Sequence, residues 1–157
     1  MTTLSDYGAL FREAYAALHG GRPGEAAGAS ARRPGESLEE YLSRTRSEAL
    51  GRIERRLSAA EPPEGLRKAH DILLRLLAGA MEAEAALSAQ VEAYRCGQFQ
   101  DSIGHSERLQ ALVSESARRD RELIIALQEA ESERPGTLAE LGIEGLLGPP
   151  QNQEPRP

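Results

Sequence analysis

The longest periodic stretch of this chain is residues 64–133, which read EGLRKAHDILLRLLAGAMEAEAALSAQVEAYRCGQFQDSIGHSERLQALVSESARRDRELIIALQEAESE. Mostly apolar side chains recur in it at alternating steps of four and three, in two series that break near Gly97. The series are Leu66, His70, Leu73, Leu77, Ala80, Glu84, Leu87, Val91, Tyr94 and then Phe99, Ile103, Ser106, Gln110, Val113, Ala117, Asp120, Ile124, Leu127. This spacing is typical of a helix that lies along a nearly antiparallel partner.

Glycine ends helices well because it adopts the left-handed conformation without strain. We therefore expect a long helical hairpin that folds at Cys96-Gly97-Gln98. In such a hairpin the numbers of facing residues add up to about 194, since the rise per residue is the same in both arms.

Further helices are expected on either side of the hairpin. Thr2 or Thr3 can cap a first helix that ends near His19, and Ser37 with Glu40 forms a capping box for a second helix that ends near Ala59. Thr137 with Glu140 repeats the capping pattern at the start of a short helix.

Four units follow from these patterns. They are an N-terminal helix (1–19), a flexible linker rich in Gly, Ala and Pro (20–36), a helical core (37–133), and a short helix with a disordered Pro-rich tail (134–157). We predict an all-α, antiparallel three- to four-helix bundle built on the hairpin. Whether the first helix docks on its own bundle or on another subunit stays open.

Composition excludes several classes of function. The chain of 157 residues has a formal net charge of −6, and nucleic acid or an anionic membrane surface would need a basic face. Cys96 is the single cysteine, so an internal disulfide or a cysteine metal cluster is excluded. No secretory signal or membrane-spanning apolar run is visible, which predicts a soluble cytoplasmic protein.

The run Pro62-Pro63-Glu-Gly-Leu66-Arg-Lys-Ala-His70-Asp-Ile-Leu73-Leu74, followed by a long helix and Gly97, resembles a helical domain common in uncharacterised bacterial proteins. That resemblance covers residues 38–130 at most, and it implies a fold and no activity. Residues 94–103 also resemble the turn of a tetratricopeptide repeat, in one copy only. The segment Leu141-Gly-Ile-Glu-Gly-Leu146 faintly resembles tags that direct cargo into encapsulin shells.

Few polar residues fall on the apolar faces. We expect His70 to be a half-buried structural histidine in contact with Glu54, and Glu84 to pair with Arg108. Asp120 is expected at a rim or beside an arginine.

Neither a metal site nor a catalytic residue is predicted. His70 and His105 would stand roughly 24 Å apart along the hairpin, too far to share a metal. Cys96 has no flanking base, and no phosphate-binding loop or nucleophile elbow is present.

The sequence thus favours a non-enzymatic interaction or assembly module that binds a protein partner, itself, or both. The alternative is a bundle that holds a small molecule or metal, with His70, Tyr41 and Tyr94 as the candidate ligand contacts.

Overall fold

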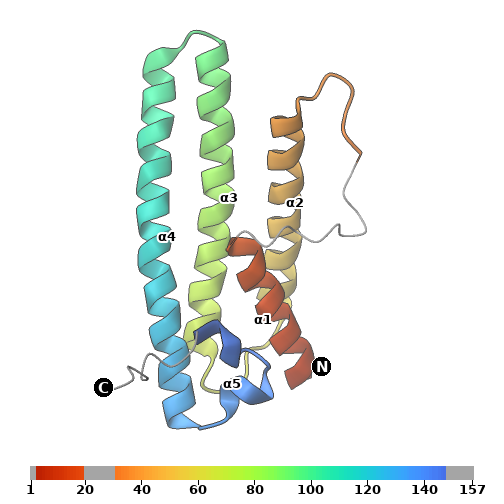
Figure 1. Ribbon diagram of the computed structural model, residues 1–157, viewed down its shortest axis with the longest axis vertical. Helices are drawn as coiled ribbons and strands as arrows, with labels where there is room; N and C mark the ends of the chain where they lie inside the picture. Colours follow the sequence, from red (N-terminus) through yellow and green to blue (C-terminus); the bar gives the residue numbers. More distant parts are fainter. Residues whose placement is uncertain (1–2, 20–30, 148–157) are drawn as a thin grey trace, which may run out of the picture.

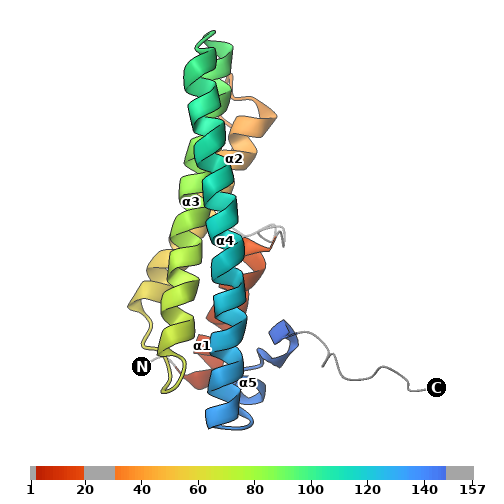
Figure 2. The ribbon, with the colours of Figure 1, turned by 90° about the vertical axis from the view of Figure 1, so that its left-hand side faces the viewer.

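The computed structural model describes residues 3–19 and 31–147, in which the chain is all helical and contains no strand. Its elements are α1 (Leu4–Leu18), α2 (Leu38–Ala59), α3 (Arg67–Arg95), α4 (Phe99–Glu133), α5 (Thr137–Glu140) and a 3-10 turn, η1 (Glu144–Leu147). Helices α3 and α4 lie side by side, α2 packs next to α3, and α1 covers only the lower part of the bundle (Figures 1 and 2). The predicted all-α bundle built on a hairpin is confirmed.

The hairpin folds at the predicted glycine. Gly97 has φ 72°, and the N–H groups of Gly97 and Gln98 donate to the carbonyls of Tyr94 (3.1 Å) and Ala93 (2.8 Å). This is the Schellman arrangement, which satisfies the last free carbonyls of α3. Cross-arm ion pairs join Arg108 to Glu82, whose numbers add up to 190, and Lys68 to Glu129, whose numbers add up to 197. Both lie close to the register expected for a fold at Gly97.

Two of the three predicted helix caps are present. Thr3 and Asp6 cap α1, and Ser37 and Glu40 cap α2, each through reciprocal backbone and side-chain hydrogen bonds.

The third predicted cap is wrong. The start of α5 is held by Glu131 at the end of α4, whose carboxylate accepts the N–H groups of Gly136 (2.7 Å) and Leu138 (3.0 Å). Thr137 instead donates its hydroxyl to the carbonyl of Arg134. Helix α5 begins at Thr137 itself, with Gly136 as its N-cap residue, so Thr137 does not occupy the capping position.

The hydrophobic core occupies only one half of the bundle, which we call the base half; the half toward Gly97 is the tip half. The core is a continuous cluster of large side chains from every helix, and on the hairpin it ends at Leu77 of α3 and Leu123 of α4. Its fully buried members include Phe11, Leu50, Leu57, Leu66, Leu73, Leu127, Leu138 and Ile143.

Helix α1 docks on its own bundle. Tyr7 and Phe11 are buried in the core, and Glu13 forms an ion pair with Arg56 of α2 at 2.8 Å. The C-terminal segment joins the same core through Leu138, Leu141 and Ile143. The described parts of the predicted units 1–19 and 134–157 are therefore packed in one body with α2, α3 and α4.

The predictions of a flexible linker at 20–36 and of a disordered Pro-rich tail fall largely outside the described residues, which do not include 20–30 and 148–157. Of the predicted linker, residues 31–36 are described. There Glu36 pairs with Arg44 of α2 at 2.8 Å.

The tip half is built differently from the base half. Small side chains, Ala86 and Ala93 of α3 and Ser102 of α4, are buried between the two arms, and Ser102 donates its hydroxyl to the carbonyl of Gln90 at 3.3 Å. Small residues let the helices approach closely, so the larger apolar side chains of these helices are not buried between α3 and α4 and stay on the surface.

Candidate functional site

An unfilled corner of the bundle is the main feature of the tip half. In the base half α1 occupies the fourth position of the bundle, against α2 and α3. Helix α1 ends at Leu18, and no described helix continues that position toward the tip. The part of the fourth position beyond Leu18 is called here the tip corner.

Large apolar side chains from three helices border the tip corner. They are 36–66% exposed, and comprise Leu38 and Leu42 of α2, Leu87, Val91 and Tyr94 of α3, and Phe99, Ile103 and Val113 of α4. On each helix their spacing continues the face that contacts α1 in the base half: Val113, for example, lies seven residues before Asp120, which contacts His19. These residues have the spacing of core positions, and they are exposed because nothing described here packs on them.

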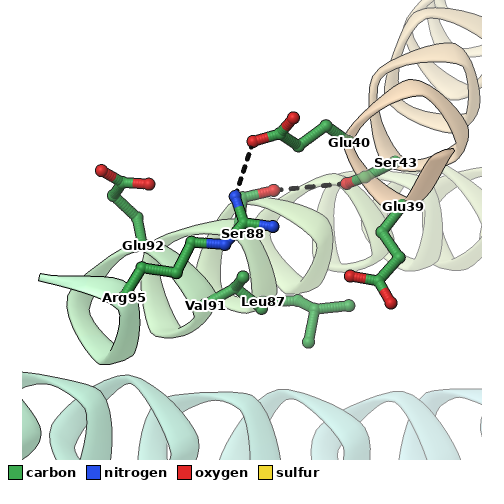
Figure 3. Close-up of a pocket in the computed structure, with 8 residues that line it drawn as sticks. All are labelled: Glu39, Glu40, Ser43, Leu87, Ser88, Val91, Glu92 and Arg95. Carbon is green, nitrogen blue, oxygen red and sulfur yellow. Dashed lines mark hydrogen bonds and ion pairs between the residues drawn. The ribbon is translucent and has the colours of Figure 1, made fainter. Parts of the chain in front are cut away.

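A hollow of about 540 Å³ lies where α2 and α3 border this corner. Leu87 and Val91 of α3 form its apolar part, and Glu39 of α2 stands across from them (Figure 3). Its remaining lining residues are Glu40, Ser43, Ser88, Glu92 and Arg95. Arg95 is paired with Glu40 at 2.8 Å, whereas Glu39 has no cationic partner in the described part of the chain.

A polar layer separates the tip corner from the core. Arg46 Nε of α2 lies 2.8 Å from a carboxylate oxygen of Glu84 on α3, and Ser43 donates to the other oxygen at 3.0 Å. At the end of α1, His19 Nε2 lies 3.2 Å from Asp120 of α4. These side chains line or adjoin a second hollow of about 310 Å³ just past Leu18. Polar groups at this height mark the end of the base core.

The predicted ion pair between Glu84 and Arg108 is wrong. Arg108 instead pairs with Glu82, which lies two residues earlier on the outer side of the hairpin. Arg46 pairs with Glu84 because α2 packs on that face of α3. Asp120 sits beside a histidine, a partner that the sequence pattern did not indicate.

His70 is buried in the structure and not half-buried, and its predicted contact with Glu54 is wrong. Its Nδ1 shares a hydrogen bond with the hydroxyl of Tyr7 on α1, at 2.9 Å, whereas Glu54 accepts from Ser58 on its own helix. Burial lowers the pKa of His70, and the nearby charge of Asp71 opposes that shift. Burial also raises the pKa of Tyr7, followed by the effect of Asp71. This buried hydrogen bond ties α1 to α3.

The three candidate ligand contacts do not meet. His70 and Tyr94 are 24 residues apart on α3, which places them about 36 Å apart along its axis. Tyr94 is exposed near the tip and packs edge-on against Phe99, with ring centroids 5.5 Å apart. Tyr41 is half-buried on α2, beneath the guanidinium of Arg44. A common site formed by His70, Tyr41 and Tyr94 is therefore excluded.

Cys96 is exposed at the hairpin turn. Its thiol donates to Glu92 at 3.5 Å, and this bond, together with the charge of Glu92, raises the pKa of Cys96. Because the thiolate is the reactive form, the carboxylate makes the cysteine a poorer nucleophile. Within residues 3–19 and 31–147, no three His, Cys, Asp or Glu side chains are grouped to hold a metal ion.

Sequence reasoning did not identify the tip corner. The apolar periodicity of the hairpin includes Leu87, Val91, Ile103 and Val113, and it was interpreted as the interface between the two arms. The spacing of Ala86, Ala93 and Ser102 shows in retrospect that the arms meet along a smaller-residue face.

No helix among the described residues combines the length and the apolar character that crossing a membrane requires. Comparisons of the chain with protein-family models, with curated proteins and with solved structures gave no significant match.

Proposed function

We propose that this chain is a non-enzymatic helical interaction module, and that the tip corner is its docking surface. One observation carries the proposal: eight large apolar side chains with core spacing border a fourth-helix position that the described chain leaves empty. Exposed apolar surfaces of this extent on a folded domain commonly mark protein interaction sites.

The occupant that best fits this surface is a helix. Three helices already border the position, and α1 fills its lower end with the packing of a four-helix bundle. A fourth helix beyond Leu18 would contact all three helices. It would bury Leu87 and Val91 of α3, Leu42 of α2 and Ile103 of α4. Docking of an amphipathic helix in an apolar groove is a common recognition mode. The helix can belong to another protein or, in self-association, to a second copy.

The proposal is tested by native mass spectrometry of tagged protein purified from its own host. The wild-type chain is compared with a corner double variant, Leu42→Glu/Ile103→Glu, in which two exposed corner residues become charged. Ile125→Glu is the matched control, because Ile125 is 50% exposed on α4 but lines a different hollow.

We expect the wild-type chain and Ile125→Glu to carry a stoichiometric second chain, of another protein or of their own kind, and the corner double variant to lose it. Circular dichroism checks that all three proteins fold alike. An assembly of the same mass in all three would refute the proposal, and so would a monomeric wild type that captures nothing.

A further inference from the structure

The length of the tip corner sets the size of its occupant. On α3 the open stretch runs from Glu84 to Tyr94, about 15 Å at 1.5 Å per residue, and on α4 it runs from Phe99 to Val113, about 21 Å. A helix that fills it has about 10–14 residues, or three to four turns. Its axis would continue that of α1 beyond Leu18.

Arginines near the tip corner are paired with carboxylates, whereas several carboxylates have no cationic partner among the described residues. The arginines that border the α2–α3 side are already paired, Arg95 with Glu40 at 2.8 Å and Arg46 with Glu84 at 2.8 Å. Glu39 lies next to Leu87 and Val91 in the hollow and has no cationic partner among the described residues.

Two further carboxylates add to this excess. Glu92 is met only by the thiol of Cys96, and Glu107, four residues after Ile103 on α4, likewise has no ion pair in the described part. The rim of the corner therefore carries a surplus of negative charge around an apolar floor.

The two longer segments outside the described residues lack the side chains that such a helix needs. Residues 20–30 and 148–157 contain no Leu, Ile, Val, Met, Phe, Tyr or Trp, so they have no side chains to fill an apolar floor. A second copy would bring one acidic rim against another, in a chain whose formal net charge is −6. Like charges placed across an interface disfavour association.

We propose that the tip corner binds an amphipathic helix of about 10–14 residues from a partner protein, with an apolar stripe flanked by Lys or Arg. The apolar stripe packs on Leu42, Leu87, Val91 and Ile103, and a basic flank faces Glu39. Glu92 adds negative charge at the opposite edge of the same hollow (Figure 3). This inference rests on the proposed function, and it adds the charge and the length of the partner segment.

Two synthetic peptides of 14 residues test the inference on the full-length chain. Both carry the same leucine stripe at helical spacing, with lysine at all flanking positions in one and glutamate in the other, and binding is followed by fluorescence anisotropy. We expect the lysine peptide to bind at least tenfold more tightly than the glutamate peptide. Raising the salt concentration should reduce the difference, because it screens the charges.

Charge reversal of the rim provides the decisive comparison. Glu39→Lys/Glu92→Lys should weaken the lysine peptide at least tenfold and strengthen the glutamate peptide. The control Glu64→Lys/Glu133→Lys makes the same change in net charge with two exposed residues near the base end of the hairpin. At physiological salt, charges act over roughly 8 Å, so this control should bind both peptides as the wild type does.

The outcomes separate the two proposals. Equal binding of both peptides that disappears in Leu42→Glu/Ile103→Glu would overturn the basic partner and leave the docking surface in place. A chain that binds neither peptide but dimerises through the corner would assign the corner to a second copy and overturn this inference. Peptide binding that is unaffected by Leu42→Glu/Ile103→Glu would overturn both proposals.

Discussion

Gly8 is the point of closest approach between α1 and the C-terminal segment, so Gly8→Ala tests how these two chain ends are packed. A Cβ atom at position 8 would lie 2.0 Å from the carbonyl oxygen of Leu141 and 2.9 Å from its carbonyl carbon. Contacts below 3.0 Å are essentially never seen for real Cβ atoms, so the backbone at Leu141 would have to move by about 1 Å. That shift would disturb Leu138 and Ile143, which are buried in the core.

Gly8→Ala has two opposing effects on the free energy of unfolding. Overpacking a closed core costs typically 1–3 kcal/mol, about as much as a displaced backbone contact should cost here. Replacing a helical glycine by alanine returns about 0.5–1 kcal/mol through backbone entropy. The two effects leave a net loss of about 0–2.5 kcal/mol, so we expect Gly8→Ala to lower the free energy of unfolding by about 1 kcal/mol in urea denaturation followed by circular dichroism. Amide exchange of Ile143, which donates to the carbonyl of Leu138, should become faster.

Gly104→Ala is the matched control, because Gly104 lies inside α4 and a Cβ atom there would meet nothing within 4 Å. It should raise the free energy of unfolding by about 0.5–1 kcal/mol. If Gly8→Ala gained as much stability as Gly104→Ala, the close approach of α1 to Leu141 would be refuted.

The contact between Tyr7 and His70 supports two further predictions. Tyr7→Phe removes the hydroxyl that is hydrogen-bonded to His70 Nδ1, and it should lower the free energy of unfolding by about 1–3 kcal/mol because it leaves a buried polar atom unpaired. The control is Tyr94→Phe, whose hydroxyl has no partner in the described part of the chain, and it should change the free energy of unfolding by less than about 0.5 kcal/mol. A cost in Tyr7→Phe no larger than in Tyr94→Phe would contradict that role. Because burial lowers the pKa of folded His70, the unfolded chain binds the proton first, and stability should fall as the pH drops below about 6.5, by at most about 1.4 kcal/mol per pH unit. Urea denaturation between pH 7.5 and 5.5 should show this slope in the wild type and a smaller one in His70→Gln; equal slopes would count against it.

Local chemistry made part of the fold predictable. The turn at Gly97 and the capping boxes at Thr3 and Ser37 depend on residues within six positions of one another, and all three formed as the sequence indicates. Their hydrogen bonds are satisfied within the segment itself, so distant parts of the chain do not compete for them.

Long-range contacts account for what the sequence could not reveal. The partner of His70 lies 63 residues away, and Gly8 meets a carbonyl 133 residues further along. The predicted cap at Thr137 is absent, and Glu131 of α4 accepts N–H groups at the start of α5 instead. Neither the docking of α1 in cis nor the packing of the C-terminal segment could be read from periodicity, which identifies an apolar face and not the helix that covers it.

The tip corner illustrates the same limit at the candidate site. Periodicity correctly marked Leu87, Val91 and Ile103 as positions of core type, and it could not show that α1 ends too early to cover them. The length of one helix measured against another is a property of the assembled bundle.

The described helices leave the tip corner uncovered, and the stability of corner variants tests directly whether the whole chain does so. Leu42→Ala and Ile103→Ala remove side chains that are 55% and 52% exposed, and Leu77→Ala removes one that is fully buried. In urea denaturation at low protein concentration, we predict a loss of less than about 1 kcal/mol for each corner variant, against about 2–5 kcal/mol for Leu77→Ala. A loss of 2–5 kcal/mol in the corner variants would mean that the chain itself covers the corner, and it would contradict a surface kept open for a partner helix.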